Sequence, residues 1–400
     1  IQPRTSSPLL TAESKKRVLP KRQEIITGIR KEIIEVLIRL EVLGLIIRHY
    51  PNPFTWLKVF QAMDPHRKSI LGNRRVKKIA KVEGKYYWGA YIPAWPTDIF
   101  HDFLKAELHR VYQISSKTNR LTNIYLAITN KCPLQCDHCY EWDALNKKEK
   151  SSLDGLKNIV KKFQAEGVSQ IHLSGGEPLV KIKDVIELLQ TSKKNSEFWV
   201  LTSGFNLSME NALSLRRAGL SGVMISLDHY DAEWHNMFRG FENAYTGAID
   251  GARNSISAGL VTVLNLCVTK AFVSEDNLMK YMELAQNLGV AFVQFLEPRA
   301  VGHYKGQNVD LTREQELIVE EFYIKMNYDD LYKDYPAVCY HGYHQRRMGC
   351  HAAGKRSVYI DTVGDVHACP FCQAATGNAH TDDIHGCMGT LQKTGCHKFS

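Results

Sequence analysis

Three cysteines in the middle of the chain have a spacing that suits iron–sulfur chemistry. Cys132, Cys136 and Cys139 stand in the segment YLAITNKCPLQCDHCYEW, with three and then two residues between them. Zinc ribbons and fingers typically use two separated cysteine pairs, and a redox dithiol uses a single CxxC. Three thiolates on one loop can instead hold three irons of a cubane 4Fe-4S cluster. The fourth iron then keeps an open position at which a small molecule can bind.

A second group of cysteines lies near the end of the sequence. Cys350 is followed by 13 residues, a glycine and four more residues before Cys369, and Cys372 completes the motif CPFC. Cys387 and Cys396 come later at longer spacings. Clustered cysteines in a cytosolic protein bind metal more often than they form disulfides. A structural zinc ion on four of these thiolates is the alternative to an iron–sulfur cluster here.

The elements that must position the first cysteines are an alternating series of strands and helices. The expected strands are 124–129, 170–173, 198–202, 222–227, 261–268 and 291–296, and the expected helices between them are 152–165, 182–189, 208–218, 244–258 and 277–288. This order predicts an α/β fold with a parallel sheet and right-handed crossovers. Six such units can curl into a partial (β/α)6 TIM-like barrel, whose site lies at the carboxyl ends of the strands. Cys267, inside the fifth strand, is expected to be a small buried apolar residue.

Two flanking regions complete the expected organisation. Residues 1–120 form a basic, mostly helical N-terminal extension, with 23 Lys and Arg against 10 Asp and Glu, and 121–335 form the barrel. Residues 336–400 form a small Cys-rich domain with a hairpin whose strands are 357–361 and 365–368. The basic region could steer an acidic peptide, but a solvated basic face, or one that docks on the acidic remainder of the chain, is the favoured explanation of the charge.

The segment Glu32–Tyr50 is the best candidate for a membrane contact. Five charged residues interrupt it, so it is too polar for a membrane-spanning helix. Its apolar spacing predicts an amphipathic helix that lies on a protein core. The sequence shows no secretion signal, and we therefore expect a cytoplasmic protein without a transmembrane segment.

The spacing CxxxCxxC after the first strand resembles the signature of radical S-adenosylmethionine (SAM) enzymes. The resemblance implies that Cys132, Cys136 and Cys139 hold a 4Fe-4S cluster whose open iron is chelated by the amino and carboxylate groups of SAM. Reductive cleavage would then give a 5′-deoxyadenosyl radical that abstracts hydrogen from a substrate. A one-electron reductant such as flavodoxin or ferredoxin would be the partner that supplies the electron.

Later motifs follow in the order that this family shows. The segment LSGGEPL ends the second strand, and the family's Gly-Gly-Glu-Pro motif contacts the methionine amino group of SAM. Two glycines permit close backbone approach, and a carboxylate can pair with an ammonium. The resemblance also places a ring next to the adenine, and a serine and an arginine at the ribose or carboxylate. The residues assigned to the cofactor on this basis are His138, Tyr140, Gly175, Gly176, Glu177, Pro178, Ser203, Ser226, Arg239 and Asn265.

Each of these assignments has a plainer alternative. The glycine motif could be an ordinary strand-ending turn, Ser226 a capping serine, and Arg239 a surface arginine. Asn265 and Glu297 are expected to point into the barrel, but buried polar residues often satisfy backbone groups instead.

The tail is similar to the start of the SPASM or twitch extensions of radical SAM enzymes. There a cysteine-flanked hairpin holds an auxiliary 4Fe-4S cluster. The resemblance implies a second cluster on Cys350, Cys369, Cys372 and a fourth ligand, with Cys396 favoured over Cys387. The full SPASM pattern is incomplete in this sequence, so we expect one auxiliary cluster.

The resemblance suggests a peptide or protein substrate, because enzymes with this kind of tail commonly modify peptides. Others act on sugars or on tetrapyrrole and quinone cofactors. Peptide-modifying members often carry an N-terminal recognition domain of three strands and three helices, and the mostly helical pattern of 1–120 gives no sign of one. The competing hypotheses are a zinc module that binds nucleic acid and a plain electron carrier. Neither explains the glycine motif and the barrel-like alternation, so nucleic acid is not an expected partner.

Overall fold

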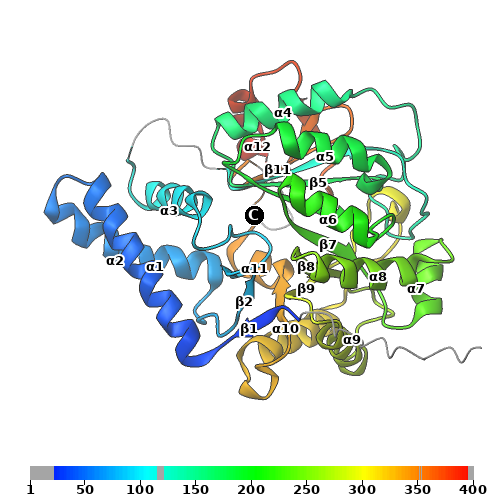
Figure 1. Ribbon diagram of the computed structural model, residues 1–400, viewed down its shortest axis with the longest axis horizontal. Helices are drawn as coiled ribbons and strands as arrows, with labels where there is room; N and C mark the ends of the chain where they lie inside the picture. Colours follow the sequence, from blue (N-terminus) through cyan, green and yellow to red (C-terminus); the bar gives the residue numbers. More distant parts are fainter. Residues whose placement is uncertain (1–21, 115–120, 351, 353, 395–400) are drawn as a thin grey trace, which may run out of the picture.

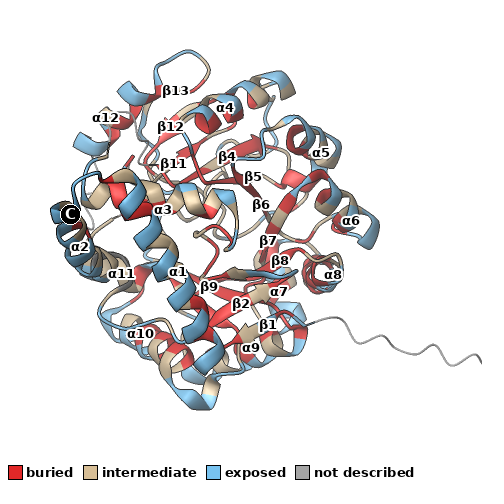
Figure 2. Ribbon diagram, turned by 60° about the vertical axis from the view of Figure 1, so that its left-hand side comes forward, coloured by how far each residue is buried: buried red, intermediate tan, exposed pale blue. Residues whose placement is uncertain are grey.

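A ten-stranded sheet forms the centre of the protein, and helices cover its outer face (Figure 1). The computed structural model describes residues 22–114, 121–350, 352 and 354–394. The strand order across the sheet is β10-β9-β8-β7-β6-β5-β4-β11-β12-β13. Figure 2 shows the buried strands in the middle and the exposed outer faces of the helices around them.

The six expected strands are present, adjacent and parallel. They are β4 (Asn123–Thr129), β5 (Gln170–Gly175), β6 (Glu197–Thr202), β7 (Leu220–Ser226), β8 (Val261–Cys267) and β9 (Phe292–Leu296). The helices between them are α4 (Leu153–Ala165), α5 (Ile182–Thr191), α6 (Met209–Ala218), α7 (Ala232–Arg239), α8 (Ala244–Ser257) and α9 (Glu275–Leu288). The expected α/β architecture is therefore confirmed, and α7 is the helix of this set that the sequence pattern missed.

Helix α4 shows why these segments fold as they do. The side chain of Ser152 accepts a hydrogen bond from the backbone N–H three residues later and so caps the helix. The apolar residues Leu156, Ile159, Val160 and Phe163 recur every three or four positions, and all four are buried. This spacing places them on one face, which packs on the sheet.

The C-terminal region extends the same sheet at both edges. Strand β10 (Ala337–Tyr340) pairs parallel with β9, and β11 (Ser357–Ile360) pairs parallel with β4. Strands β11 and β12 (Asp365–His367) form the expected antiparallel hairpin, followed by β13 (Ala375–Asn378) and α12 (Ile384–Thr394). The expected domain boundary near 335 lies after α10 (Arg313–Tyr328) and before α11 (His341–Met348), and the sheet continues across it. Three short 3-10 helices complete the region from β5 onward, namely η1 (Pro178–Lys181), η2 (Gly302–Tyr304) and η3 (Asp330–Tyr332).

The described part of the N-terminal region is mostly helical, as expected, and also contains a small sheet that was not expected. Its elements are β1 (Glu24–Ile26), α1 (Gly28–His49), α2 (Pro53–Leu71), β2 (Ile79–Val82), β3 (Lys85–Tyr87) and α3 (Asp98–Val111). The strands pair antiparallel in the order β1-β2-β3. The sequence pattern gave no sign of these three strands. Strands of three or four residues are too short for an alternating pattern to be visible.

This small sheet and the loop after it pack against the inside of the barrel strands. Ala80 and Tyr87 belong to one buried apolar cluster with Trp199 of β6 and Phe292 of β9. The hydroxyl of Tyr91 donates a 2.8 Å hydrogen bond to the Gln294 side chain on β9. Contacts of this kind fix the N-terminal region to the barrel interior.

The long helix α1 packs on the protein along one face only. Ile34, Leu45 and Ile46 are buried on that face, which confirms the expected contact with a protein core. The opposite face is exposed, as Figure 2 shows for the helix that crosses the front of the molecule. Within the described residues, no helix is both long and apolar enough to span a membrane.

A buried ion pair joins the N-terminal helices to the sheet. Both carboxylate oxygens of Glu107 on α3 accept hydrogen bonds from the Arg356 guanidinium, at 2.8 and 2.7 Å. Burial alone would raise the pKa of Glu107, but hydrogen bonds from His66 and Arg356 hold this pKa at about 2. Because the folded pKa lies below the ordinary value, the pair stabilises the fold above about pH 4.5 and loses this effect as the pH falls toward 2.

We predict that Glu107→Gln lowers the free energy of unfolding by about 3 kcal/mol at neutral pH, because it leaves Arg356 without its carboxylate. Urea unfolding at several pH values measures this, and the difference from the wild type should shrink below pH 4.5. Glu187→Gln, which removes an exposed ion pair with Lys157, is the control and should cost far less than Glu107→Gln. An equal effect of the two substitutions would contradict the role assigned to Glu107.

Candidate active site

The first cysteine loop begins where β4 ends. The thiols of Cys132, Cys136 and Cys139 lie close enough together for each to influence the charge of another. Burial raises the pKa of Cys132 and of Cys139 to about 12 and also raises that of Cys136. The Asn146 side chain accepts a hydrogen bond from the Cys132 N–H at 3.1 Å and donates one to the Cys132 carbonyl at 3.0 Å. In the absence of a metal these thiols are therefore protonated at neutral pH, and metal binding would release their protons.

The end of α7 holds one side of this loop. The N–H of Gln135 donates to the carbonyl of Arg239 and the N–H of Asp137 to the carbonyl of Phe238, both at 3.0 Å. Gly240 follows with φ +59°, and a Cβ there would lie 2.7 Å from the Gln135 carbonyl oxygen. Glycine therefore permits the close approach of α7 to the cysteine loop.

The segment after β9 holds the other side. The N–H of His303 donates to the Cys139 carbonyl at 2.9 Å, and the His303 ring nitrogen Nδ1 lies 3.1 Å from the Cys136 carbonyl oxygen. The His303 ring also stacks on Trp142 at 3.8 Å between centroids. A Cβ on Gly302 would lie 2.2 Å from the Cys139 carbonyl oxygen. Sequence reasoning missed Asn146, Gly240, Gly302 and His303, because backbone contacts of this kind leave no recurring pattern.

The two glycines of the LSGGEPL motif contact the beginning of the same loop. The N–H of Gly176 donates to the Thr129 carbonyl at 2.7 Å, and a Cβ on Gly175 would lie 2.2 Å from that oxygen. A Cβ on Gly176 would lie 2.5 Å from the Lys131 carbonyl oxygen. These glycines therefore let the end of β5 pass directly against the chain that leads into Cys132.

Glu177 is buried and hydrogen-bonded to protein groups. Its carboxylate accepts the Leu179 N–H at 3.0 Å, the Thr202 hydroxyl at 2.7 Å, and the N–H and hydroxyl of Ser203 at 2.8 and 2.7 Å. Burial raises the pKa of Glu177, and these hydrogen bonds oppose the increase. Pro178 is also buried and begins η1. The carboxylate thus links the ends of β5 and β6, and the expected contact with a cofactor ammonium stays a prediction.

Arg239 lies in the interior and is paired with Asp228. Its Nε and Nη2 atoms lie 2.6 and 2.5 Å from the Asp228 Oδ2 atom, and its Nη1 lies 3.5 Å from the sulfur of Cys136. Burial disfavours the arginine's charge, but Asp228 raises its pKa above the usual value. The alternative of a surface arginine is therefore wrong. Asp228, which received no role from the sequence, also accepts the Cys267 N–H at 3.0 Å and so links β7 to β8.

Several polar atoms near the strand ends have no hydrogen-bond partner within the described structure. They include Nδ1 of His138 and Oδ1 of Asn265, which faces Ser226 across the β7–β8 pair. The His138 ring stacks on Phe238 at 4.9 Å, and burial lowers the pKa of His138 to about 4, so the ring is neutral. A bound molecule with polar groups could satisfy such atoms.

Glu297, unlike His138 and Asn265, has side-chain partners for its carboxylate in the described structure. It is bonded by the Tyr340 hydroxyl at 2.7 Å and by Arg346 at 2.6 Å, and a third contact reaches Arg299 at 3.2 Å. The carboxylate is thus satisfied by side chains and not by the backbone groups that the sequence analysis gave as the alternative.

A histidine that the sequence analysis did not single out lies inside the barrel. His172 on β5 is fully buried, stacks on Tyr125 of β4 at 5.1 Å, and also contacts Tyr91 and Trp199. Neither ring nitrogen has a hydrogen-bond partner in the described structure, and burial lowers the pKa of His172 to about 3. A neutral imidazole can offer one donor and one acceptor to a bound substrate. His172 directly precedes the LSGGEPL motif and alternates with the apolar residues Ile171 and Leu173 along the strand. This alternation was the sequence signal that could have pointed to His172.

Three of the C-terminal cysteines lie together. A hydrogen bond from Cys372 lowers the pKa of Cys369, and the thiol of Cys350 acts on the same group. Cys387 lies on α12 among buried apolar side chains, and a Cβ on Gly377 would lie 2.4 Å from its sulfur. Cys396, the expected fourth ligand, lies outside the described residues. None of the nine described cysteines forms a disulfide.

The two cysteine groups are neighbours. Tyr140, directly after the first group, packs edge-on against Tyr359 of β11 at 5.9 Å and against Phe371 at 6.0 Å. Phe371 stands between Cys369 and Cys372.

Within the described residues, no three His, Cys, Asp or Glu side chains are arranged around a position for a single metal ion.

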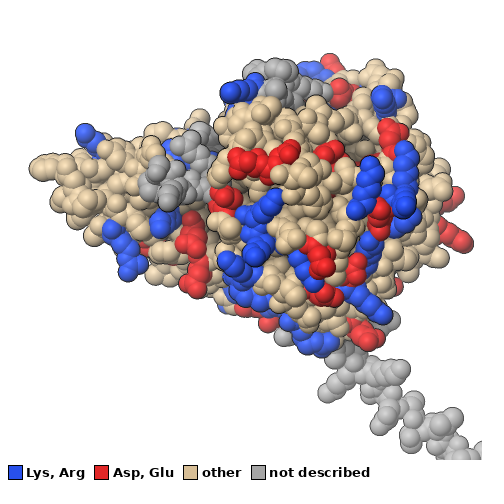
Figure 3. Space-filling view, turned by 90° about the horizontal axis from the view of Figure 1, so that it is seen from above, with Lys and Arg blue, Asp and Glu red and all other residues tan. Residues whose placement is uncertain are grey.

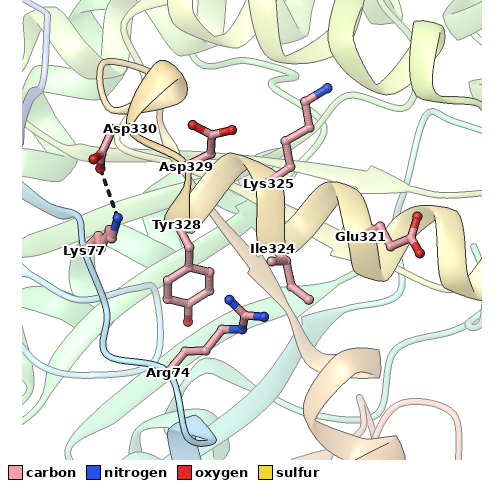
Figure 4. Close-up of a pocket in the computed structure, with 8 residues that line it drawn as sticks. All are labelled: Arg74, Lys77, Glu321, Ile324, Lys325, Tyr328, Asp329 and Asp330. Atoms are coloured by element: carbon pink, nitrogen blue, oxygen red, sulfur yellow. Dashed lines mark hydrogen bonds and ion pairs between the residues drawn. The ribbon is translucent and has the colours of Figure 1, made fainter.

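Two surface pockets differ in their relation to this site. The smaller, of about 240 Å³, is lined by Leu134 of the cysteine loop and by Ser203, Phe205 and Phe241. The larger, of about 630 Å³, lies between α10 and the segment after α2 and is open, with several charged residues in its lining and Lys77 bonded to Asp330 at 3.0 Å (Figure 4). None of its lining residues comes from the strand ends that carry the cysteine loop. The cysteine loop therefore places the candidate active site at the strand ends and not in the larger pocket.

The comparisons with known proteins agree with this geometry. Residues 126–294 match the profile of the Radical SAM superfamily. This segment of the chain therefore has the sequence of a Radical SAM domain, and the members of that superfamily are enzymes that use SAM and a 4Fe-4S cluster.

Individual relatives resemble only part of the chain or only its fold. GTP 3′,8-cyclase of Helicobacter pylori is 29% identical over 181 residues, which are 44% of this chain and 56% of that protein. The chain thus spans just over half the length of this curated relative. The structure of Streptococcus suis SuiB bound to precursor peptide SuiA has a TM-score of 0.54 at 13% identity and covers 76% of this chain and 72% of that one. The structure of anSMEcpe with bound AdoMet has a TM-score of 0.53 at 17% identity and covers 69% and 83%.

We predict that Gly302→Ala displaces the cysteine loop, because the new Cβ would collide with the Cys139 carbonyl. Gly306→Ala is a matched control, since its φ is also positive but no atom lies within 4 Å of the added Cβ. Backbone strain of about 1 kcal/mol affects both variants. Urea unfolding should therefore show a clearly larger loss for Gly302→Ala. Equal losses would mean that the loop does not depend on this contact.

Proposed function

We propose that this protein reductively cleaves SAM at a 4Fe-4S cluster on Cys132, Cys136 and Cys139 and uses the resulting radical to abstract hydrogen from a peptide or protein substrate. The observation that supports this most directly is the cysteine loop itself. Three neighbouring thiols follow β4 and are held between α7 and η2, directly beside the Gly175-Gly176 backbone. Metal-binding thiols need this kind of fixed support.

The residues present fit the cluster and SAM. Three thiols supply the donor set for three irons. The unpartnered atoms of His138 and Asn265, together with Ser226 and the Gly175–Glu177 segment, offer polar groups for the adenosine and methionine parts of SAM. When bound, the reduced cluster and SAM would supply the 5′-deoxyadenosyl radical.

The protein's own side chains tune this environment. Arg239, fixed by Asp228, places a positive charge beside the Cys136 sulfur, and this charge stabilises a thiolate. His138 stays neutral at physiological pH and can lie against an aromatic base without adding charge. Tyr125, His172 and Trp199 fill the barrel interior with stacked rings that would exclude water from a radical.

A peptide substrate is supported by the N-terminal region. Residues 24–111 contain three helices and three short strands, the element content that the family resemblance attaches to peptide recognition. The excess of Lys and Arg over residues 1–120 would attract an acidic peptide. The described fold is also similar to that of SuiB, which was crystallised with its precursor peptide.

An auxiliary 4Fe-4S cluster on Cys350, Cys369, Cys372 and Cys396 completes the proposal. The first three thiols lie together, whereas Cys387 lies in an apolar core. Tyr140 and Phe371 lie between this group and the first loop, so the two clusters would be close neighbours. A flavodoxin or ferredoxin would supply electrons to the first cluster.

Cys132→Ala should abolish 5′-deoxyadenosine formation from SAM and dithionite in protein reconstituted without oxygen, and should remove about four irons. Cys339→Ala, at a cysteine outside both groups, is the control and should keep both properties. Product formation by Cys132→Ala at the wild-type rate would refute the proposed cluster. Colourless, zinc-loaded wild-type protein that gives no product would favour the zinc-module alternative.

The auxiliary cluster has its own test. Cys350→Ala should lower the iron content from about eight to about four per chain and leave the first cluster in place. Cys396→Ala should do the same, whereas Cys387→Ala should not. An iron content of about four per chain in the wild type would mean that the protein holds only one cluster.

The substrate class can be tested by adding candidate substrates to the reconstituted enzyme. A short acidic peptide encoded beside the gene should raise 5′-deoxyadenosine formation and lose hydrogen, visible by mass spectrometry. GTP, added in parallel, should give neither effect. Turnover of GTP would mean that the substrate is a nucleotide and not a peptide, and it would leave the proposed radical chemistry unchanged.

A further inference from the structure

The outer face of α1 carries an uninterrupted apolar stripe. Its six members are spaced by four, three, four, three and four residues, and their exposure ranges from 41% to 81%: Ile29, Ile33, Val36, Leu40, Leu43 and Ile47. This is the a/d repeat of a coiled-coil seam. Isolated exposed apolar residues are common, but a contiguous exposed patch marks an interaction site.

The stripe is separate from the face that packs on the protein. Ile34, Leu45 and Ile46 are buried on the opposite side of the helix. One apolar face therefore serves the fold, and the second face is available for another molecule. Figure 3 shows charged side chains of both signs scattered among uncharged ones on the left-hand lobe.

The charges beside the stripe favour a second helix over a lipid surface. Helix α1 carries three glutamates along with its four basic residues, so an anionic membrane would attract it only weakly. The stripe also lacks the Trp and Phe anchors of interfacial helices. Glu32 and Arg39 lie on the same side of the stripe, seven residues apart, and their side chains are 58% and 55% exposed.

These two charges select one pairing. If two copies of α1 pack antiparallel with Ile33 against Val36 of the second copy, each Glu32 meets Arg39 of the other copy. The same shift places Ile29 against Leu40 of the second copy, so four of the six stripe residues pair, and Leu43 and Ile47 lie beyond the contact. Shifting by one heptad would pair all six stripe residues but would bring the two Arg39 side chains together, which is unfavourable. A twofold interface of this kind is self-complementary, so every contact occurs twice.

We propose that a second copy of this chain docks on the apolar stripe of α1 and forms an antiparallel helix pair that makes the protein a dimer. The interface is independent of the radical chemistry, since no stripe residue belongs to the cysteine sites.

Sedimentation and light scattering of the intact protein test the proposal. The wild type should have twice the mass of one chain, and Leu40→Glu should be monomeric with an unchanged circular dichroism spectrum. Leu331→Glu, at an exposed leucine on η3, is the matched control and should stay dimeric. A monomeric wild type at all concentrations, or a Leu40→Glu variant that is still a dimer, would overturn the proposal.

Charge reversal tests the register. Arg39→Glu and Glu32→Arg should each weaken the dimer at least about tenfold, because each places like charges opposite one another. The double variant should recover most of the affinity. Failure of this recovery would overturn the antiparallel register. Co-sedimentation of monomeric wild type with phosphatidylcholine–phosphatidylglycerol vesicles would assign the stripe to a membrane and would also overturn the proposal.

Discussion

The candidate site depends on close backbone contact between the cysteine loop and three other segments. Gly176, Gly240 and Gly302 each lie where a Cβ would collide with a carbonyl of that loop. The loop carbonyls and N–H groups are in turn paired with the ends of β5 and α7 and with the segment after β9. Because these partners come from distant positions in the chain, the shape of the loop depends on the tertiary fold. A parallel sheet makes this possible, since it gathers the carboxyl ends of its strands at one edge.

Charge at the site follows from the same arrangement. Asp228 holds Arg239 against the sulfur of Cys136, and the backbone of β8 completes the hydrogen bonding of Asp228. A buried pair of this kind loses hydration but gains a fixed geometry when its remaining hydrogen bonds are satisfied. Glu177 acts similarly between β5 and β6. Both carboxylates thus connect strands at the edge that carries the cysteines.

Much of the barrel could be predicted from the sequence because its strands are apolar runs and its helices have long amphipathic repeats. The chemistry of Cys132, Cys136 and Cys139 was also predictable, since their spacing is local. The partners of Arg239 and Glu177 were not, because a motif names a residue without saying which neighbours occupy its hydrogen-bonding atoms. The strands of the N-terminal sheet are too short to produce a pattern, and β10 and β11 join the barrel sheet through pairings that only the tertiary structure reveals. The apolar residues of α1 were read as one buried face, although they form two opposite faces.

The most direct test of the central claim is electron paramagnetic resonance of anaerobically reconstituted, dithionite-reduced protein before and after addition of SAM. The account predicts the signal of a reduced 4Fe-4S cluster that changes when SAM binds the open iron, and a signal of this kind should be missing from Cys132→Ala. A cluster signal that is identical with and without SAM would contradict the claim that the loop after β4 presents an open iron to this cofactor.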